Sequence, residues 1–175
     1  MKKSSIFCLA IIIVSFILSA CNNKNTDEQG SKDKTEQEVR AANNQFYKAL
    51  NSMFTGNIKP MNEIWSHSND VTDLGPFGGD RLVGWKAVGA EFQREADLKL
   101  GGKVNCKDLL VFAGKDIGYT VCVEEGENID AEGKPIIIKF RATNIFRLEN
   151  GQWKMVHHHT DLSTPLQEAT SKDKK

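Results

Sequence analysis

The chain has 175 residues, 39% of them hydrophobic, which is enough for one ordinary domain with a buried core. Its 23 basic residues balance 23 acidic ones, and this even balance argues against a nucleic-acid-binding protein, which usually carries a basic excess. A charged fraction of 26% also argues against disorder of the whole chain.

The first twenty residues have the pattern of an export signal. The basic start Lys2-Lys3 precedes an apolar run from Ile6 to Ala20. A helix of this length spans about 22 Å at roughly 1.5 Å per residue, which is short of a bilayer core of about 30 Å. A short apolar run after a basic start favours a cleaved signal peptide over an anchor helix that stays in the membrane.

The end of this run, Leu18-Ser19-Ala20-Cys21, resembles the lipobox of bacterial lipoproteins. The resemblance implies cleavage before Cys21 and acylation of that cysteine. The exported protein would then be lipid-anchored in the bacterial cell envelope, either on the outer side of the cytoplasmic membrane or in the outer membrane. More than one acyl chain is expected, because a single chain binds a bilayer only marginally.

Two polar segments flank the expected domain. Residues 22–34 contain no apolar side chain and are predicted to form a flexible tether with a span of about 20 Å. Residues 35–166 are predicted to fold, and residues 167–175 are expected to be a polar tail. Loss of Lys2 and Lys3 with the signal would reduce the basic residues from 23 to 21, against 23 acidic ones.

Helical patterns come first in the domain. Thr35-Glu36-Gln37-Glu38 matches a capping box, and apolar residues then recur at spacings of three and four until Gly56. These residues are Val39, Ala42, Phe46, Ala49 and Met53. A short helix from Pro60 to Trp65 and a longer one from Trp85 to Ala96 are also expected.

Strand patterns follow the helices. A short strand is expected at residues 71–74, and alternating patterns predict longer strands at 104–113, 117–125, 135–149 and 152–163. Helices followed by strands indicate an α+β fold with an antiparallel sheet.

The dipeptide Asn150-Gly151 predicts the register of the last two strands, because it is a strong signal for a two-residue hairpin turn. The expected pairs are Leu148 with Trp153, Phe146 with Met155, Asn144 with His157 and Ala142 with His159. Asn144, His157 and His159 would then lie on the apolar, core-facing side of the hairpin. A bulge would shift this register by one residue.

Cys106 and Cys122 fall on the same face of the hairpin expected from residues 104–125. Two interpretations stay open for this pair. The exported compartment permits a disulfide between them, and the alternative is two separate thiols in the core.

The order of these segments resembles the SnoaL-like branch of the nuclear-transport-factor-2-like superfamily. The residues that carry the resemblance are FYKAL in the first helix, DVTDLGPFGG, the helix start at Gly84-Trp85 and the ending ATNIFRLENGQWKMVHHHTDLS. Residues 153–159 are also similar to the terminal strand of the association domain of calmodulin-dependent kinase II. The resemblance covers about residues 36–163.

The resemblance implies a cone-shaped, curved antiparallel sheet wrapped over the N-terminal helices, the cystatin-like α+β barrel. It also implies a ligand pocket at the wide end and homodimers formed through the outer sheet face. The expected function is binding of a small, partly apolar molecule, with acid–base catalysis of the isomerase, cyclase or dehydratase kind as one option. The alternative is a non-catalytic assembly module for an envelope protein.

Asp73, His157 and His159 are the candidate catalytic residues. A shielded carboxyl at Asp73 can act as a general base, and two histidines on one strand face can take a proton or orient a ligand. The structural alternatives are an aspartate that braces a turn and histidines bonded to backbone. His67 and Asp73 are available for a metal, but no spacing demands one, so neither metal nor cofactor is expected.

The expected pocket wall consists of Trp65, Trp85, Tyr119 and Asn144, with ordinary core packing as the alternative for the tryptophans. In the ketosteroid-isomerase branch, an aspartate base works with a tyrosine and a protonated acid. This chain has only Tyr47 and Tyr119, and no second acid was expected on the core face, which argues against steroid-type isomerisation.

Overall fold

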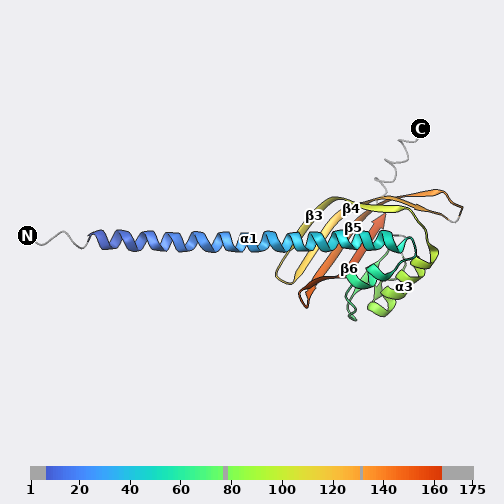
Figure 1. Ribbon diagram of the computed structural model, residues 1–175, viewed down its shortest axis with the longest axis horizontal. Coiled ribbons are helices and arrows are strands. Elements are labelled where there is room, and N and C mark those ends of the chain that lie inside the picture. Colours follow the sequence, from blue (N-terminus) through green and yellow to red (C-terminus); the bar gives the residue numbers. More distant parts are fainter. Residues whose placement is uncertain (1–6, 77–78, 131, 163–175) are drawn as a thin grey trace, which may run out of the picture. The chain divides into compact units, whose positions relative to one another are not determined.

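The computed structural model describes residues 7–76, 79–130 and 132–162, shown as a ribbon in Figure 1. Its contacts divide the chain into two compact units, Met1–Thr35 and Glu36–Lys175. The polar tail predicted at residues 167–175 lies outside the described residues, as does the basic start of the signal. None of the described helices combines the length and the hydropathy needed to cross a membrane.

The first helix, α1, runs without interruption from Phe7 to Met53. Residues 22–34 are therefore helical, and the flexible tether predicted there is wrong. The segment contains no proline, and its Lys, Glu and Gln residues are good helix formers, although its Asn, Asp and Gly residues are not. The side-chain amide of Gln29 donates to Asp33 Oδ1 at 2.7 Å across one helical turn.

The helix also does not begin at Thr35, so the predicted capping box is wrong. Thr35 lies inside α1, and its hydroxyl donates to the backbone oxygen of Ser31, 2.9 Å away. A threonine within a helix commonly bonds the carbonyl of the preceding turn in this way. The predicted start of the folded domain nevertheless coincides with the boundary between the two compact units, at residues 35 and 36.

Six strands form one curved sheet in the second unit (Figure 1). They are β1 (Thr72–Leu74), β2 (Leu82–Val83), β3 (Lys103–Ala113), β4 (Ile117–Ile129), β5 (Pro135–Glu149) and β6 (Gln152–Leu162). The order across the sheet is β2-β1-β6-β5-β4-β3, and all neighbours are antiparallel except β1 and β6, which are parallel. The predicted α+β fold is therefore confirmed.

The core forms where the helices meet the sheet. Besides α1, these helices are α2 (Lys59–Ile64) and α3 (Trp85–Leu98). The predicted apolar face of α1 is buried at Val39, Ala42, Phe46, Ala49 and Met53, and α3 buries Val88, Phe92 and Ala96. These rows at spacings of three and four show that apolar periodicity identified the buried faces of both helices correctly.

The β5–β6 hairpin turns at Asn150-Gly151, as predicted. Both residues have positive φ, 51° and 78°, which is the requirement of the tight turn that favours Asn-Gly. Glu149 pairs with Gln152, and the pairs continue outward through Leu148 with Trp153 and Phe146 with Met155. This half of the predicted register is confirmed.

Beyond Met155 the register shifts by one residue because β6 contains a bulge. Ile145 pairs with His157 and Phe146 with Met155, so Val156 has no partner on β5. Asn144 consequently lies opposite His158 rather than His157. Because successive strand residues point to opposite faces, one extra residue reverses the facing of everything that follows it.

Candidate functional site

A cavity of about 190 Å³ lies between the sheet and the helices α1 and α3. Its apolar wall comes from both helices and from the sheet: Phe46, Leu50, Phe54, Met61, Phe92, Leu98, Leu100, Val104 and Ile138. Its polar residues are Asp73, Arg94, Glu95, Glu124, Asn128, His158 and Thr160. An apolar pocket with a few convergent polar groups is the usual form of a small-molecule site.

Asp73 lies on β1 and is the one predicted catalytic residue that reaches this cavity. Its side chain is only 6% exposed, and Oδ1 is a buried oxygen without a hydrogen-bond partner. Burial raises the pKa of Asp73 to about 7, with a further contribution from Glu95 and then Glu91 on α3. A carboxyl with such a pKa exchanges protons readily near neutral pH.

Glu124 on β4 is a second buried acid in the same cavity, which the sequence analysis did not anticipate. The Tyr47 hydroxyl donates to Glu124 Oε1 at 3.0 Å, and the same hydroxyl lies 3.1 Å from Cys122 Sγ. Burial raises the pKa of Glu124 to about 7, although the tyrosine hydrogen bond opposes the shift. The expectation that no second acid accompanies a tyrosine near Asp73 is therefore wrong.

His158 is the histidine of the triple-His segment that lines the cavity. Its Nδ1 lies 2.6 Å from Asn144 Oδ1, and since an amide oxygen can only accept, the proton is on Nδ1 and Nε2 is the basic nitrogen. Burial lowers the pKa of His158 to about 3, with smaller effects from His157 and His159. The imidazole is therefore neutral at physiological pH.

A chain of buried side-chain amides holds His158 in place. Asn144 Nδ2 donates to Asn43 Oδ1 at 2.9 Å, and the Thr120 hydroxyl donates to the same oxygen at 2.8 Å. Asn43 and Asn144 are both fully buried. A buried network whose members are all bonded gives a unique side-chain arrangement, so Asn144 is a positioning residue for His158.

His157 and His159 do not line the cavity, so the core-facing orientation predicted for them is wrong. His157 is half-buried, and its Nδ1 lies 2.7 Å from the Thr72 hydroxyl. His159 is exposed. Both point away from the cavity side because the bulge at Val156 reverses their facing.

None of the four predicted wall residues lines the cone cavity. Trp65 is 1% exposed and packs in the core against the ring of Phe92, with ring centroids 5.3 Å apart. Trp85 stacks on His67 at 4.3 Å. Tyr119 lies on the outer sheet face, where it is 42% exposed and stacks on Phe112.

Asn144, the fourth, accepts a hydrogen bond from His158 and does not line the cavity itself. Strand alternation could have predicted Glu124, a lining residue that the sequence analysis missed. Gly118, Thr120, Cys122, Glu124 and Asn128 are all buried on one side of β4. The parity of Cys122 would have placed Glu124 inward, so this signal was present in the sequence.

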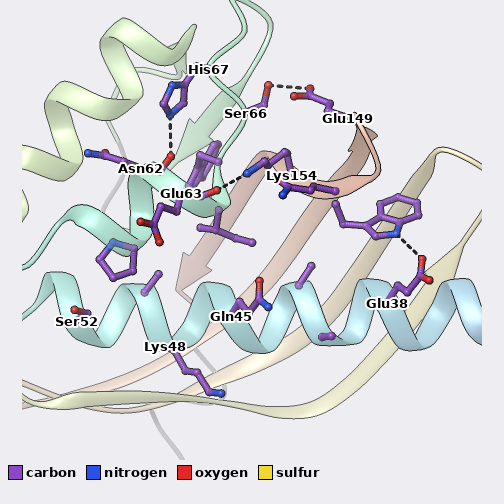
Figure 2. Close-up of a pocket in the computed structure, with 18 residues that line it drawn as sticks. Glu38, Gln45, Lys48, Ser52, Asn62, Glu63, Ser66, His67, Glu149 and Lys154 are labelled. Atoms are coloured by element: carbon purple, nitrogen blue, oxygen red, sulfur yellow. Dashed lines mark hydrogen bonds between the residues drawn. The ribbon is translucent and has the colours of Figure 1, made fainter.

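A second, wider depression of about 1100 Å³ lies between α1, α2 and the β5–β6 turn (Figure 2). Several of its polar side chains are already bonded to protein. Lys154 Nζ donates to the backbone oxygen of Glu63 at 2.6 Å, and His67 Nε2 lies 2.9 Å from the backbone oxygen of Asn62. Because these polar groups are already bonded to protein, this depression is a weaker candidate than the cone cavity.

The two cysteines are diagonal neighbours, since Cys106 pairs with Glu124 two residues from Cys122. Both are free thiols in the structure, so the disulfide stays a prediction. Within the described ranges, no group of three or more His, Cys, Asp or Glu side chains is placed to hold a metal ion.

Comparisons with known proteins identify the family. The model of the SnoaL-like domain matches residues 39–166. The chain belongs to the SnoaL-like family. Among curated proteins, no sequence matches this SnoaL-like chain significantly.

Solved structures agree with the fold of this SnoaL-like domain. A proposed dehydratase of the NTF2-like family from Streptomyces avermitilis is 21% identical, with a TM-score of 0.65 over 75% of this chain and 97% of that one. A proposed calcium/calmodulin-dependent protein kinase type II association domain from Thiobacillus denitrificans is 24% identical, with a TM-score of 0.60 over 71% and 94%. The CaMKII association domain of C. elegans is 14% identical, with a TM-score of 0.59 over 75% and 98%. At these identities the likeness establishes the fold alone.

Proposed function

We propose that this protein is an exported, membrane-anchored SnoaL-like domain that binds a small, partly apolar molecule in the cone cavity. The observation that carries the proposal is the buried, unpartnered Oδ1 of Asp73, a residue that lines an otherwise largely apolar pocket. A buried polar atom without a partner costs about 1–3 kcal/mol. A ligand that donates a hydrogen bond to this oxygen recovers that cost.

The size of the cavity supports a compact ligand. A dry cavity of about 150 Å³ is large enough for benzene, and the cone cavity measures about 190 Å³. Phe46, Phe54 and Phe92 supply flat apolar surface, while Asp73 and Glu124 supply polar atoms. The ligand is accordingly one ring or a short branched chain that carries one polar group.

Ligand binding is tested by extracting the purified full-length protein and identifying released small molecules by mass spectrometry. Leu98 lines the cavity and is 54% exposed, so Leu98→Trp should block the entrance without filling a buried site. Leu110→Trp is the matched control, because Leu110 is 58% exposed on β3 outside the cavity lining. We expect a compound that is retained by wild type and the control and lost from Leu98→Trp; equal recovery from all three would contradict the proposal.

Acid–base catalysis is a second candidate function, favoured by the pairing of Asp73 and Glu124 in one cavity. Asp73, with a pKa raised to about 7, can remove a proton from carbon next to a carbonyl group. Glu124, whose pKa is also raised to about 7, can in its protonated form donate a hydrogen bond to the oxyanion that develops. This chemistry fits an isomerase, cyclase or dehydratase.

Deuterium exchange into cyclohexanone, followed by NMR in D₂O, tests this proton transfer without knowledge of the natural substrate. General-base catalysis contributes typically 10²–10⁴-fold, so Asp73→Asn should slow the exchange by about 100-fold or more. Asp116→Asn removes a carboxylate from the exposed β3–β4 turn and should leave the rate unchanged. A wild-type rate equal to that of buffer alone would refute the enzymatic function.

An assembly module remains the alternative from a different class. It is favoured by an apolar patch on β3 and β4, formed by Leu110, Phe112, Ile117, Tyr119 and Val121, each between 38% and 58% exposed. Large exposed apolar patches commonly mark interaction surfaces. Light scattering should report a dimer that Phe112→Glu dissociates, and a wild-type monomer would argue against this role.

A further inference from the structure

Three carboxyl groups from three different elements line the cone cavity. Asp73 comes from β1, Glu95 from α3 and Glu124 from β4. Asp73 and Glu95 are close enough for the charge of Glu95 to raise the pKa of Asp73. Asp73 is only 6% exposed, and its Oδ1 has no hydrogen-bond partner. The cluster therefore includes a buried polar atom that a bound ligand could satisfy.

The described lining residues of the cavity include three acids but one permanent cation, Arg94, whose charge acts on Glu95. Arg94 is the one basic side chain among the described lining residues that carries a permanent charge, and its guanidinium Nε donates to Glu91 Oε2 on the same helix at 2.9 Å. His158 is neutral because burial lowers its pKa to about 3. A pocket with three acids and a single cation that is already paired with Glu91 is complementary to a positive ligand.

The same cavity is shaped for an organic cation rather than a metal. No group of metal-ligating side chains in the described part of the chain is arranged to hold an ion. Phe46, Phe54 and Phe92 instead line the cavity, and aromatic rings attract ammonium groups and bury hydrocarbon. The volume of about 190 Å³ leaves room for one ring with a short substituent.

We propose that the ligand of the cone cavity is a small primary ammonium compound with an apolar body, whose charged head is held by Asp73 and Glu95. This inference rests on the proposed ligand-binding function and is independent of the proposed proton transfer. The three N–H donors of an ammonium group can satisfy Asp73 Oδ1 and still reach a second carboxylate.

Proton release on binding is the thermodynamic consequence. Burial raises the pKa of Asp73, Glu95 and Glu124 to about 7 each, so each carboxyl is about half protonated at neutral pH. A bound cation favours the ionised form, so protons leave as the ligand enters. The neighbouring groups that act on these acids are Glu91 and Arg94 of α3, Tyr47 of α1, Cys106 of β3 and His158 of β6.

Calorimetric titration of the purified full-length protein with three probes of similar shape tests the inference. The probes are benzylammonium chloride, benzyl alcohol and sodium benzoate. Benzylammonium should bind at least about tenfold more tightly than benzyl alcohol, since a hydrogen bond to a charged group contributes about 1.5–3 kcal/mol. Benzoate should not bind, because its carboxylate would face Asp73 and Glu95.

Matched variants locate the effect. Asp73→Asn and Glu95→Gln should each weaken benzylammonium binding by about 10- to 100-fold. Glu95 is half-buried on α3, so its replacement does not disturb the core. Asp116→Asn removes the same charge from an exposed turn and should leave the affinity unchanged.

The pH dependence gives an independent readout. Benzylammonium affinity should rise as the pH increases from 6 to 8, and the binding heat should change with the ionisation enthalpy of the buffer, which reports released protons. Benzyl alcohol binding as tightly as benzylammonium would overturn the ammonium inference and leave the proposed ligand binding intact. Binding of none of the probes would overturn the inference as well, while extraction of a neutral compound that Leu98→Trp excludes would still support the proposed function.

Discussion

Asp73 on β1 and His158 on β6 are register partners in neighbouring parallel strands, and both side chains line the cone cavity. The two groups are buried, and burial shifts their pKa values in opposite directions: that of the acid rises to about 7 and that of the imidazole falls to about 3. Near neutral pH the imidazole is therefore uncharged and the carboxyl is partly protonated. A pair that is neutral when empty and easily ionised is suited to respond to a ligand's charge.

The two neighbouring histidines of β6 should differ sharply in their effect on stability. His158→Ala should lower the free energy of unfolding by about 2–4 kcal/mol, because it leaves buried Asn144 Oδ1 unpaired and opens a space beside Phe46, whose ring lies 5.0 Å from the imidazole. His159→Ala, at an exposed position of the same strand, should change it by less than about 0.5 kcal/mol. Urea titration measures both, and equal losses would contradict the inward facing of His158.

Removal of the Asp73 carboxyl should change how stability depends on pH. The pKa of this group is about 7 in the folded protein and near the ordinary 3.8 when unfolded. Between these two pH values the folded protein keeps a proton on Asp73 that the unfolded protein has released. The free energy of unfolding therefore falls as the pH rises from about 4 to about 7. Asp73→Asn should be more stable than wild type at pH 8, by up to about 4 kcal/mol, and the difference should shrink towards pH 4.

The same unfolding measurements contain an internal control. His158 contributes with the opposite sign, since its folded pKa of about 3 lies below the ordinary 6.5, and its contribution is lost as the pH falls between these values. Wild type and Asp73→Asn share this term, so it cancels in their difference. A difference that does not vary with pH would refute the raised pKa of Asp73.

The two cysteines should react differently with iodoacetamide. Cys106 is half-buried, and hydrogen bonds, chiefly from Cys122, lower the pKa of its thiol. Cys122 is buried, and its hydrogen bond to Cys106, together with burial, raises the pKa of its thiol. Because the thiolate is the reactive form, Cys106 should be alkylated first in the native, unreduced protein. Mass spectrometry reads the order directly, and absence of labelling until a reductant is added would instead indicate the predicted disulfide.

Acylation of Cys21 should anchor the exported protein. Cys21→Ala should abolish incorporation of a clickable palmitate analogue in a bacterial host and shift the protein out of the membrane fraction, because the acyl chains supply the membrane affinity. Cys8→Ala changes a cysteine within the predicted signal and should keep both the label and the membrane association. Equal labelling of the two variants would contradict the lipobox assignment.

Much of the fold could be predicted because apolar periodicity and turn chemistry are local signals. The spacing of Val88, Phe92 and Ala96 placed α3, and Asn150-Gly151 placed the last hairpin. The register failed beyond Met155 because nothing in the residues around Val156 marks a bulge, which depends on how β6 fits its neighbours. Continuous helix through residues 22–34 was missed because a polar, uncapped segment carries no periodic signal.

The candidate site was predicted less well than the fold, and the reason is again geometric. Asp73 was found because the family resemblance places residues 71–74 on a strand beside the pocket, and the structure has this residue on β1. Glu95 was missed because its approach to Asp73 depends on the rotation of α3, which the helix pattern does not specify. Glu124 could have been placed inward from the parity that it shares with Cys122. Tyr119 was misplaced because both faces of β4 carry apolar side chains, so hydrophobicity did not distinguish the outer face, where Tyr119 lies, from the inner one.

The bulged residue Val156 in β6 determines which histidine of this strand faces the cavity. Trp153 and Met155 are buried and precede the bulge, so their facing does not depend on it. The facing of the three histidines does depend on it, because the bulge at Val156 reverses the side to which every later residue of β6 points. A regular ladder that kept Val156 would turn His157 and His159 inward, whereas deletion of Val156 would remove the bulge and leave His158 opposite Asn144. The presence of the bulge, and not the number of residues in β6, therefore decides which of three adjacent imidazoles reaches the cavity.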